Sequence, residues 1–117
     1  MREQVIQVVR EYIDAVRRND AAALPLHPDV VAVFPLSAYH GAEAFRQGLE
    51  PFVRILKGIE VVHLVADGEH CVAILNIDTV CGMIPFAEHM QVRDGQIVSI
   101  RGYYDPRPIL AGASNPA

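Results

Sequence analysis

Apolar residues at the start of the chain repeat with the period of a helix. Between residues 2 and 18, the side chains of Val5, Val9, Tyr12 and Val16 recur at spacings of three or four. This spacing places them on one face of an amphipathic α-helix. We therefore expect a long N-terminal helix that buries a wide apolar face.

Two further helices are predicted before the chain changes character. A short one is expected over Ala21 to Leu24, and a longer one over Ala42 to Leu56, where an apolar stripe again has helical spacing. Gly48 and Pro51 lie near the middle of the longer segment, and both residues disfavour a helix interior. We expect a break or a kink there.

The remaining segments have the character of strands. Asp29 to Leu36 is rich in β-branched residues and is followed by a loop, SAYHG. Asp-Gly and Cys-Gly pairs of the kind found in hairpin turns separate the later strands. Four strands are predicted there, at Ile59–Ala66, His70–Val80, Ile84–Arg93 and Gln96–Tyr104.

The order of these elements, ααβαββββ, predicts an α+β fold. A curved antiparallel sheet would wrap around the N-terminal helix in one domain over residues 1–110, followed by a flexible tail over residues 111–117. Both faces of the predicted strands are apolar, and the predicted helices are too few to cover two faces. We therefore expect the outer face to meet a second copy of the chain in a homodimer.

Charge and composition exclude several classes of protein. The 117 residues carry a formal net charge of −4 with scattered arginines, which argues against a nucleic-acid partner. No apolar run approaches the length of a membrane span, and the first turns are charged, unlike a signal peptide. A cytoplasmic protein is expected, in which Cys71 and Cys81 are free thiols.

The stretch AILNIDTV, residues 73–80, places two polar side chains on one face of a strand. Because side chains alternate along a strand, Asn76 and Asp78 share a face with Ile74 and Val80. A lone carboxylate among aliphatic residues is costly unless the site uses it. Asp78 is therefore a candidate general acid or base, and Asn76 a candidate for orienting a substrate or a water molecule.

Glu88 is a second candidate acid on a neighbouring strand. The parity that turns Phe86 and Met90 inward also turns Glu88 inward. Two carboxylates in one apolar cavity raise the pKa of at least one of them, through desolvation and mutual repulsion. The residues leave open the alternative that Glu88 is a solvated position of an edge strand.

Tyr12 has two interpretations, because its ring lies on the apolar stripe of the first helix. Its hydroxyl either points into the same cavity or is satisfied within the core. Asp105, which precedes a proline, is typical of a turn or capping residue. The five histidines show no metal-binding spacing, and no nucleotide or nucleophile motif is present, so we expect neither a metal nor a cofactor.

Several stretches together resemble the nuclear-transport-factor-2-like superfamily. They are EYIDAVRRNDAAAL, PLSAYHG leading into EAFRQGLE, the strand NID, the hairpin VRDGQIVSIRGYYD and the tail PRPI. The chain looks most similar to the limonene-epoxide-hydrolase, SnoaL-type cyclase and ketosteroid-isomerase branches. Over residues 3–110 this resemblance implies a cystatin-like cone with an internal pocket.

Epoxide hydrolases of this kind use an Arg-x-Asp motif on the strand matched by NID, and a second aspartate on the last strand. Asp78 matches the acid of the motif. Asn76 stands in place of the arginine, and Gly102 in place of the second aspartate. The hydrolytic set that the resemblance implies is therefore incomplete.

Ketosteroid isomerases use a tyrosine on the first helix and a protonated acid as an oxyanion hole, opposite an aspartate base. Tyr12 matches the tyrosine, and Glu88, followed by His89, matches the acid. Phe34 occupies the place of the base. We expect a substrate pocket whose further lining residues are Asn76, Phe34, Phe86, Met90, Gly102 and Tyr104.

The expected function is acid/base catalysis on a small, mostly apolar ketone without a cofactor. Asp78 would transfer the proton, while Tyr12 and a protonated Glu88 would stabilise the developing oxyanion. The alternatives are epoxide hydrolysis with a relocated base, Glu88 or Asp105, and a dimeric module that only binds a hydrophobic ligand.

Overall fold

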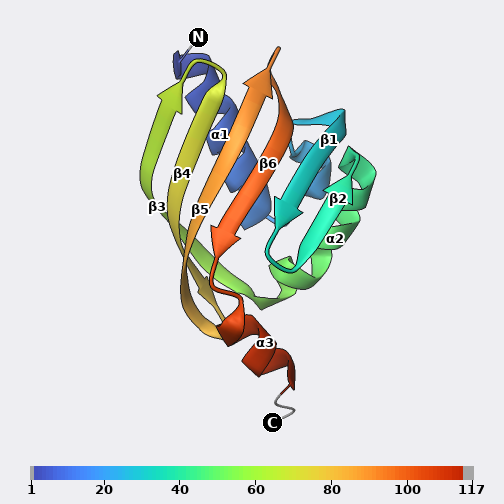
Figure 1. The fold of residues 1–117 in the computed structure, drawn as a ribbon, viewed down its shortest axis with the longest axis vertical. Coiled ribbons are helices and arrows are strands. Elements are labelled where there is room, and N and C mark those ends of the chain that lie inside the picture. The colour runs from blue at the N-terminus through green and yellow to red at the C-terminus, as the bar shows by residue number, and fades with distance from the viewer. Residues whose placement is uncertain (1, 115–117) are drawn as a thin grey trace.

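A six-stranded sheet and four helical segments make up the fold in the computed structural model, which describes residues 2–114 (Figure 1). The helices are α1 (Arg2–Arg17), the 3₁₀ turn η1 (Ala21–Ala23), α2 (Ala42–Ile55) and α3 (Arg107–Ser114). The strands are β1 (Leu26–Phe34), β2 (Ser37–His40), β3 (Leu56–Asp67), β4 (His70–Thr79), β5 (Gly82–Arg93) and β6 (Gln96–Tyr104).

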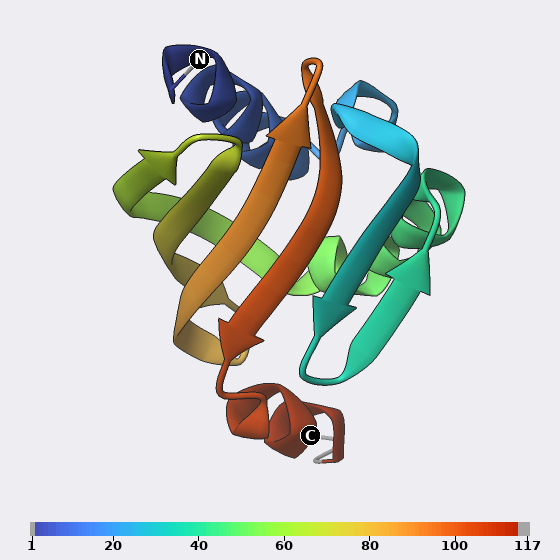
Figure 2. The ribbon, with the colours of Figure 1, turned by 45° about the horizontal axis from the view of Figure 1, so that its top comes forward.

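The strands lie in the order β2-β1-β6-β5-β4-β3, and all neighbours are antiparallel except β1 and β6. Helices α1 and α2 cover the same face, α1 against β3 to β6 and α2 against β1 and β2 (Figures 1 and 2). Register shifts in β3–β4 and β5–β6 bend the strands, since bulges increase local twist. The sheet therefore has a concave inner face that holds the helices.

The core lies between α1 and this inner face. The apolar stripe predicted for the first helix is buried, with Val9 and Ile13 at most 2% exposed. Along β4 every second residue is buried, from Cys71 to Thr79, and β5 shows the same alternation. Each strand thus presents one face to the helices and the other outward.

The predicted α+β architecture, with a curved sheet around the N-terminal helix, is confirmed. The expected loop at residues 37–40 is wrong in detail, because Ser37–His40 forms β2 against β1. Strand β1 also begins earlier than expected, at Leu26. Its ladder with β6 is interrupted between Leu26 and Val31, a stretch that contains Pro28, which has no N–H to donate.

Helix α2 continues through both residues that were expected to break it, Gly48 and Pro51. The predicted tail is also partly helical, because α3 extends to Ser114, while residues 115–117 lie outside the described residues. The expected capping role of Asp105 is confirmed, since its Oδ1 accepts a hydrogen bond from the backbone N–H of Arg107 at 3.0 Å. Both cysteines are free, as predicted.

The outer face of the sheet carries an apolar row. Ile74, Ala87 and Tyr103 lie opposite one another across β4, β5 and β6, and Tyr103 is 54% exposed. The homodimer through this face stays a prediction. None of the helices among residues 2–114 combines the length and the apolar character of a membrane span.

Charge placed on the apolar row tests the predicted homodimer. Tyr103→Arg is expected to give the mass of one chain in light scattering, because two facing copies would each bury an unpaired guanidinium. Leu36→Asp, which changes an exposed apolar residue in the β1–β2 turn, is the control and should keep the mass of two chains. A monomeric wild type would show the predicted homodimer to be wrong.

Candidate acid/base site

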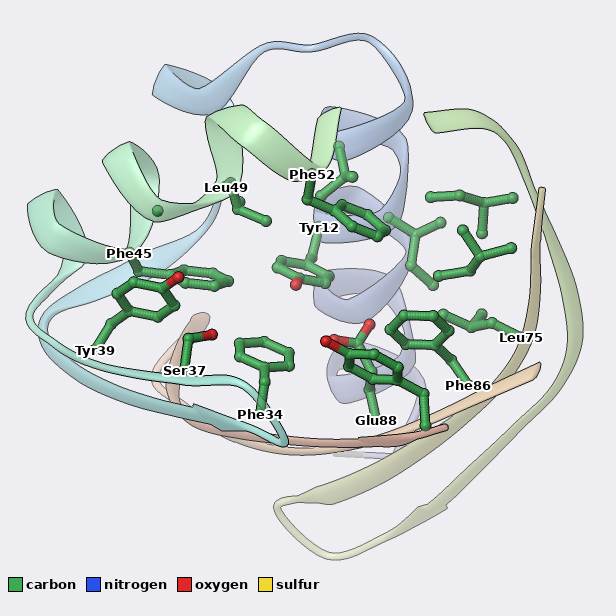
Figure 3. Close-up of a pocket in the computed structure, with 16 residues that line it drawn as sticks. Tyr12, Phe34, Ser37, Tyr39, Phe45, Leu49, Phe52, Leu75, Phe86 and Glu88 are labelled. Atoms are coloured by element: carbon green, nitrogen blue, oxygen red, sulfur yellow. The ribbon is translucent and has the colours of Figure 1, made fainter. Parts of the chain in front are cut away.

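A pocket opens between α1, α2 and the inner face of the sheet (Figure 3). Aromatic and aliphatic side chains form most of its wall. The described residues that line it are Tyr12, Ile13, Val16, Phe34, Ser37, Tyr39, Phe45, Gly48, Leu49, Phe52, Ile59, Leu75, Ile77, Phe86, Glu88 and Tyr104. Glu88 is the only carboxylate among them.

Glu88 lies in the middle of β5 with its side chain turned to the inner face, as the strand parity predicts. Its partners on the neighbouring strands are Ala73 of β4 and Gly102 of β6, two of the smallest residues. The small side chain of Ala73 leaves space beside Glu88, whereas the ring of Phe34 lies over Gly102. The residue is 6% exposed, so the alternative of a solvated edge position is wrong.

Burial changes the acid strength of Glu88. Desolvation raises the pKa of its carboxyl from 4.5 to about 7, and a hydrogen bond from Tyr12 opposes part of this rise. Both protonation states are therefore populated near neutral pH. A group of this kind can accept a proton and return it in the same reaction.

Tyr12 reaches into the pocket from the buried face of α1, and its hydroxyl points toward Glu88 (Figure 3). Burial first, and then the negative charge of Glu88, raise the pKa of Tyr12 well above 10.0. The phenol therefore stays protonated and acts as a hydrogen-bond donor. Its ring is stacked on Phe45 of α2, with an interplanar angle of 10°.

Two glycines allow aromatic rings to lie close to the backbone. A Cβ atom at Gly102 would come within 2.4 Å of the Phe34 ring, and one at Gly48 within 2.2 Å of the Tyr39 ring. Real Cβ atoms do not approach ring atoms this closely, so both contacts require glycine. Gly102 thus acts on the pocket through Phe34 and is itself absent from the wall.

The comparisons with known proteins identify the family of this chain. Residues 9–100 match the family profile of the SnoaL-like domain. The chain belongs to the SnoaL-like domain family. No protein of curated function matches the sequence.

Solved structures similar to this SnoaL-like domain include a protein from Kribbella flavida DSM 17836, at 29% identity over 92% of each chain and a TM-score of 0.86. An NTF2-like protein of unknown function from Cytophaga hutchinsonii ATCC 33406 has 22% identity, with 91% of this chain and 94% of that chain covered, and a TM-score of 0.80. A protein named as a proposed ketosteroid isomerase, also from Kribbella flavida, has 19% identity, coverages of 88% and 78%, and a TM-score of 0.75. The predicted membership of the NTF2-like superfamily is confirmed.

Asp78 lies outside the pocket of this SnoaL-like domain, so the predicted cavity shared with Glu88 is wrong. Leu75 and Ile77 take the inner face of β4, which turns Asp78 to the outer face. Asp78 pairs with Met83 in the β4–β5 ladder, whereas Glu88 pairs with Ala73. The two carboxyls are separated along the strands as well as by the sheet itself.

Some of the other predicted pocket residues line the pocket, and others lie in the core or on the outer face of the sheet. Phe34, Phe86 and Tyr104 line the pocket, as expected. Met90 is fully buried in the core beside it. Asn76 is on the outer face, where its side-chain amide donates a hydrogen bond to Glu60 Oε1 at 2.9 Å.

Sequence reasoning missed Ser37 and Tyr39. They belong to β2, whose four residues were read as a loop, although Ser37 and Tyr39 already show the alternation of a strand. Within the described residues, no group of three or more His, Cys, Asp or Glu side chains is arranged to hold a metal ion. Among the described wall residues, Glu88 and the tyrosines remain as the groups able to move a proton.

The pKa of Glu88 makes stability depend on pH. In the unfolded chain the carboxyl loses its proton near 4.5, whereas the folded protein holds the proton up to about 7. The free energy of unfolding should therefore fall by about 3 kcal/mol as the pH rises through this window. Glu88→Gln has no proton to release and should lack this slope in urea denaturation series. Equal slopes in both proteins would contradict a buried, ionisable Glu88.

A second prediction concerns the bond between Tyr12 and Glu88. Tyr12→Phe removes a donor that stabilises the carboxylate, so the pKa of Glu88 should rise above about 7. Carbon-detected NMR of the Glu88 carboxyl during a pH titration measures the change. Tyr103→Phe, which removes a hydroxyl on the outer face, should leave the pKa unchanged. A Glu88 pKa that stays level or falls in Tyr12→Phe would show that the bond is not made.

Proposed function

We propose that this SnoaL-like domain is a cofactor-independent acid/base enzyme that moves a proton within a small apolar carbonyl compound. The observation that carries the proposal is the buried Glu88 carboxyl, with a pKa of about 7, beside a neutral Tyr12 hydroxyl in an apolar pocket. Groups with a pKa near the working pH are efficient in proton transfer. The similarity to a protein named as a proposed ketosteroid isomerase supports the same class of reaction.

In the proposed reaction, the Glu88 carboxylate removes a proton from the carbon next to the carbonyl group. The electrons of that C–H bond form the C=C bond of an enolate, and the negative charge moves to the oxygen. Because Glu88 now carries the proton, the Tyr12 hydroxyl no longer donates to a carboxylate and donates instead to this oxygen, where a donor inside an apolar site stabilises charge strongly. Glu88 then returns the proton to another carbon, which completes an isomerisation without a co-reactant.

This assignment changes the role expected for Glu88. The sequence predicted a protonated Glu88 as an oxyanion donor with Asp78 as the base, but Asp78 lies across the sheet. Among the described residues that line the pocket, Glu88 is the only carboxylate, so we assign it as the base. Epoxide hydrolysis by a pair of acids loses support for the same reason, because the wall holds one carboxylate.

Isotope exchange tests the proposal. The wild type is expected to exchange the α-protons of a small ketone for deuterium in D₂O, and the rate should rise as the pH passes through about 7, because Glu88 then loses its proton. Glu88→Gln should lower the rate by about a hundredfold or more. Asp78→Asn is the matched control and should keep the wild-type rate, because its side chain lies on the outer face.

Parallel incubations with small epoxides in ¹⁸O-labelled water separate the alternatives. If the wild type forms an ¹⁸O-labelled diol and Glu88→Gln does not, the reaction is hydrolysis and not isomerisation. Binding of ketones without exchange or hydrolysis would favour the binding module. Loss of exchange in Asp78→Asn with retention in Glu88→Gln would overturn the assignment of the base.

A further inference from the structure

The cavity beside Glu88 is small. Its volume is about 90 Å³. A cavity of about 150 Å³ in an engineered protein core holds benzene, and pockets for drug-sized ligands measure about 300–1,000 Å³. The enclosed space next to the carboxyl is therefore filled by a compound of about one six-membered ring, and any larger part of a ligand would extend through the open side of the pocket.

Two rings of the wall cannot move outward. The rings of Tyr39 and Phe34 already lie against bare backbone at Gly48 and Gly102, closer than any side chain with a Cβ would permit. Phe45, which is fully buried, packs on both rings, at 5.8 Å between centroids in each case. The rings of Tyr39 and Phe34 form one side of the cavity, opposite Phe86 (Figure 3).

Three of the rings are also nearly parallel. Tyr12 is inclined by 10° to Phe45, and Phe34 by 13° to the same ring. A flat guest can stack on the exposed face of such a ring and meet the tilted rings of Tyr39 and Phe52 edge to face, since these are inclined by 61° to Phe34 and by 58° to Phe86. An enolate conjugated with a second double bond is flat in the same way.

We infer that the site selects flat carbonyl compounds of about one six-membered ring, and that Tyr39, backed by Gly48, sets this upper limit on size. The inference rests on the proposed function for the carbonyl group. The size limit itself follows from the packing. A steroid-sized ketone would place only part of its ring system in this space.

Phenol and 2-naphthol are suitable probes, since both are flat, carry one oxygen and differ by one ring. An unrestricted apolar pocket would bind 2-naphthol more tightly, because it buries more apolar surface. We expect the wild type to reverse this order, binding phenol at least about tenfold more tightly. NMR titrations of the backbone amides give both dissociation constants.

Tyr39→Ala should improve binding of 2-naphthol by about tenfold or more and remove the preference for phenol. Gly48→Ala should weaken phenol binding, because the new methyl group pushes the Tyr39 ring into the cavity. The double variant Gly48→Ala/Tyr39→Ala should bind 2-naphthol as Tyr39→Ala does, since the methyl group then meets no ring. Tyr39→Leu serves as a second variant, with a smaller gain expected.

A wild type that prefers 2-naphthol, or folded Tyr39 variants with an unchanged preference, would overturn the size limit. Proton transfer is not required for this measurement, and Asp78→Asn, which changes a residue on the outer face, is the control that should keep the preference for phenol. If exchange of ketone protons fails while the preference for phenol holds, the proposed function falls and the size limit stands. If exchange is seen and the preference for phenol is absent, the proposed function stands and the size limit falls.

Discussion

The structure depends on one packing arrangement, in which the apolar face of α1 fills the hollow of a curved sheet. Val9 and Ile13 make this contact deep in the core, and the bulges in the long strands provide the curvature. Beyond the part that α1 fills, the hollow continues toward α2 and β2. The pocket is that remaining space, so the position of α1 determines both the core and the site.

This arrangement explains why a carboxyl can be kept away from water. Glu88 occupies a position on β5 that in most sheets would carry an aliphatic side chain, and its small partner Ala73 on β4 accommodates it. Tyr12 supplies a donor from the helix above. The desolvation that weakens the acid is a cost to folding, and the rest of the core offsets it through the burial of apolar surface.

Much of the fold was predictable from the period of apolar residues, because the helical stripe of α1 and the alternation in β4 and β5 are long. The short strand Ser37–His40 was not, since four residues give too little alternation to distinguish a strand from a loop. The inward position of Glu88 followed from its neighbours on β5. The position of Asp78 did not follow, because β4 has aliphatic residues on both faces and parity alone does not say which face is concave.

The packing of the Phe34 ring on Gly102 links two positions that are far apart in the sequence. Gly102 contributes no atom to the pocket wall, yet it decides how far the Phe34 ring can retreat. A relative with a larger residue there and a smaller one at the position of Phe34 would have a pocket of similar width. The two positions are therefore coupled through packing, and an alignment that scores wall residues singly would overlook such an exchange.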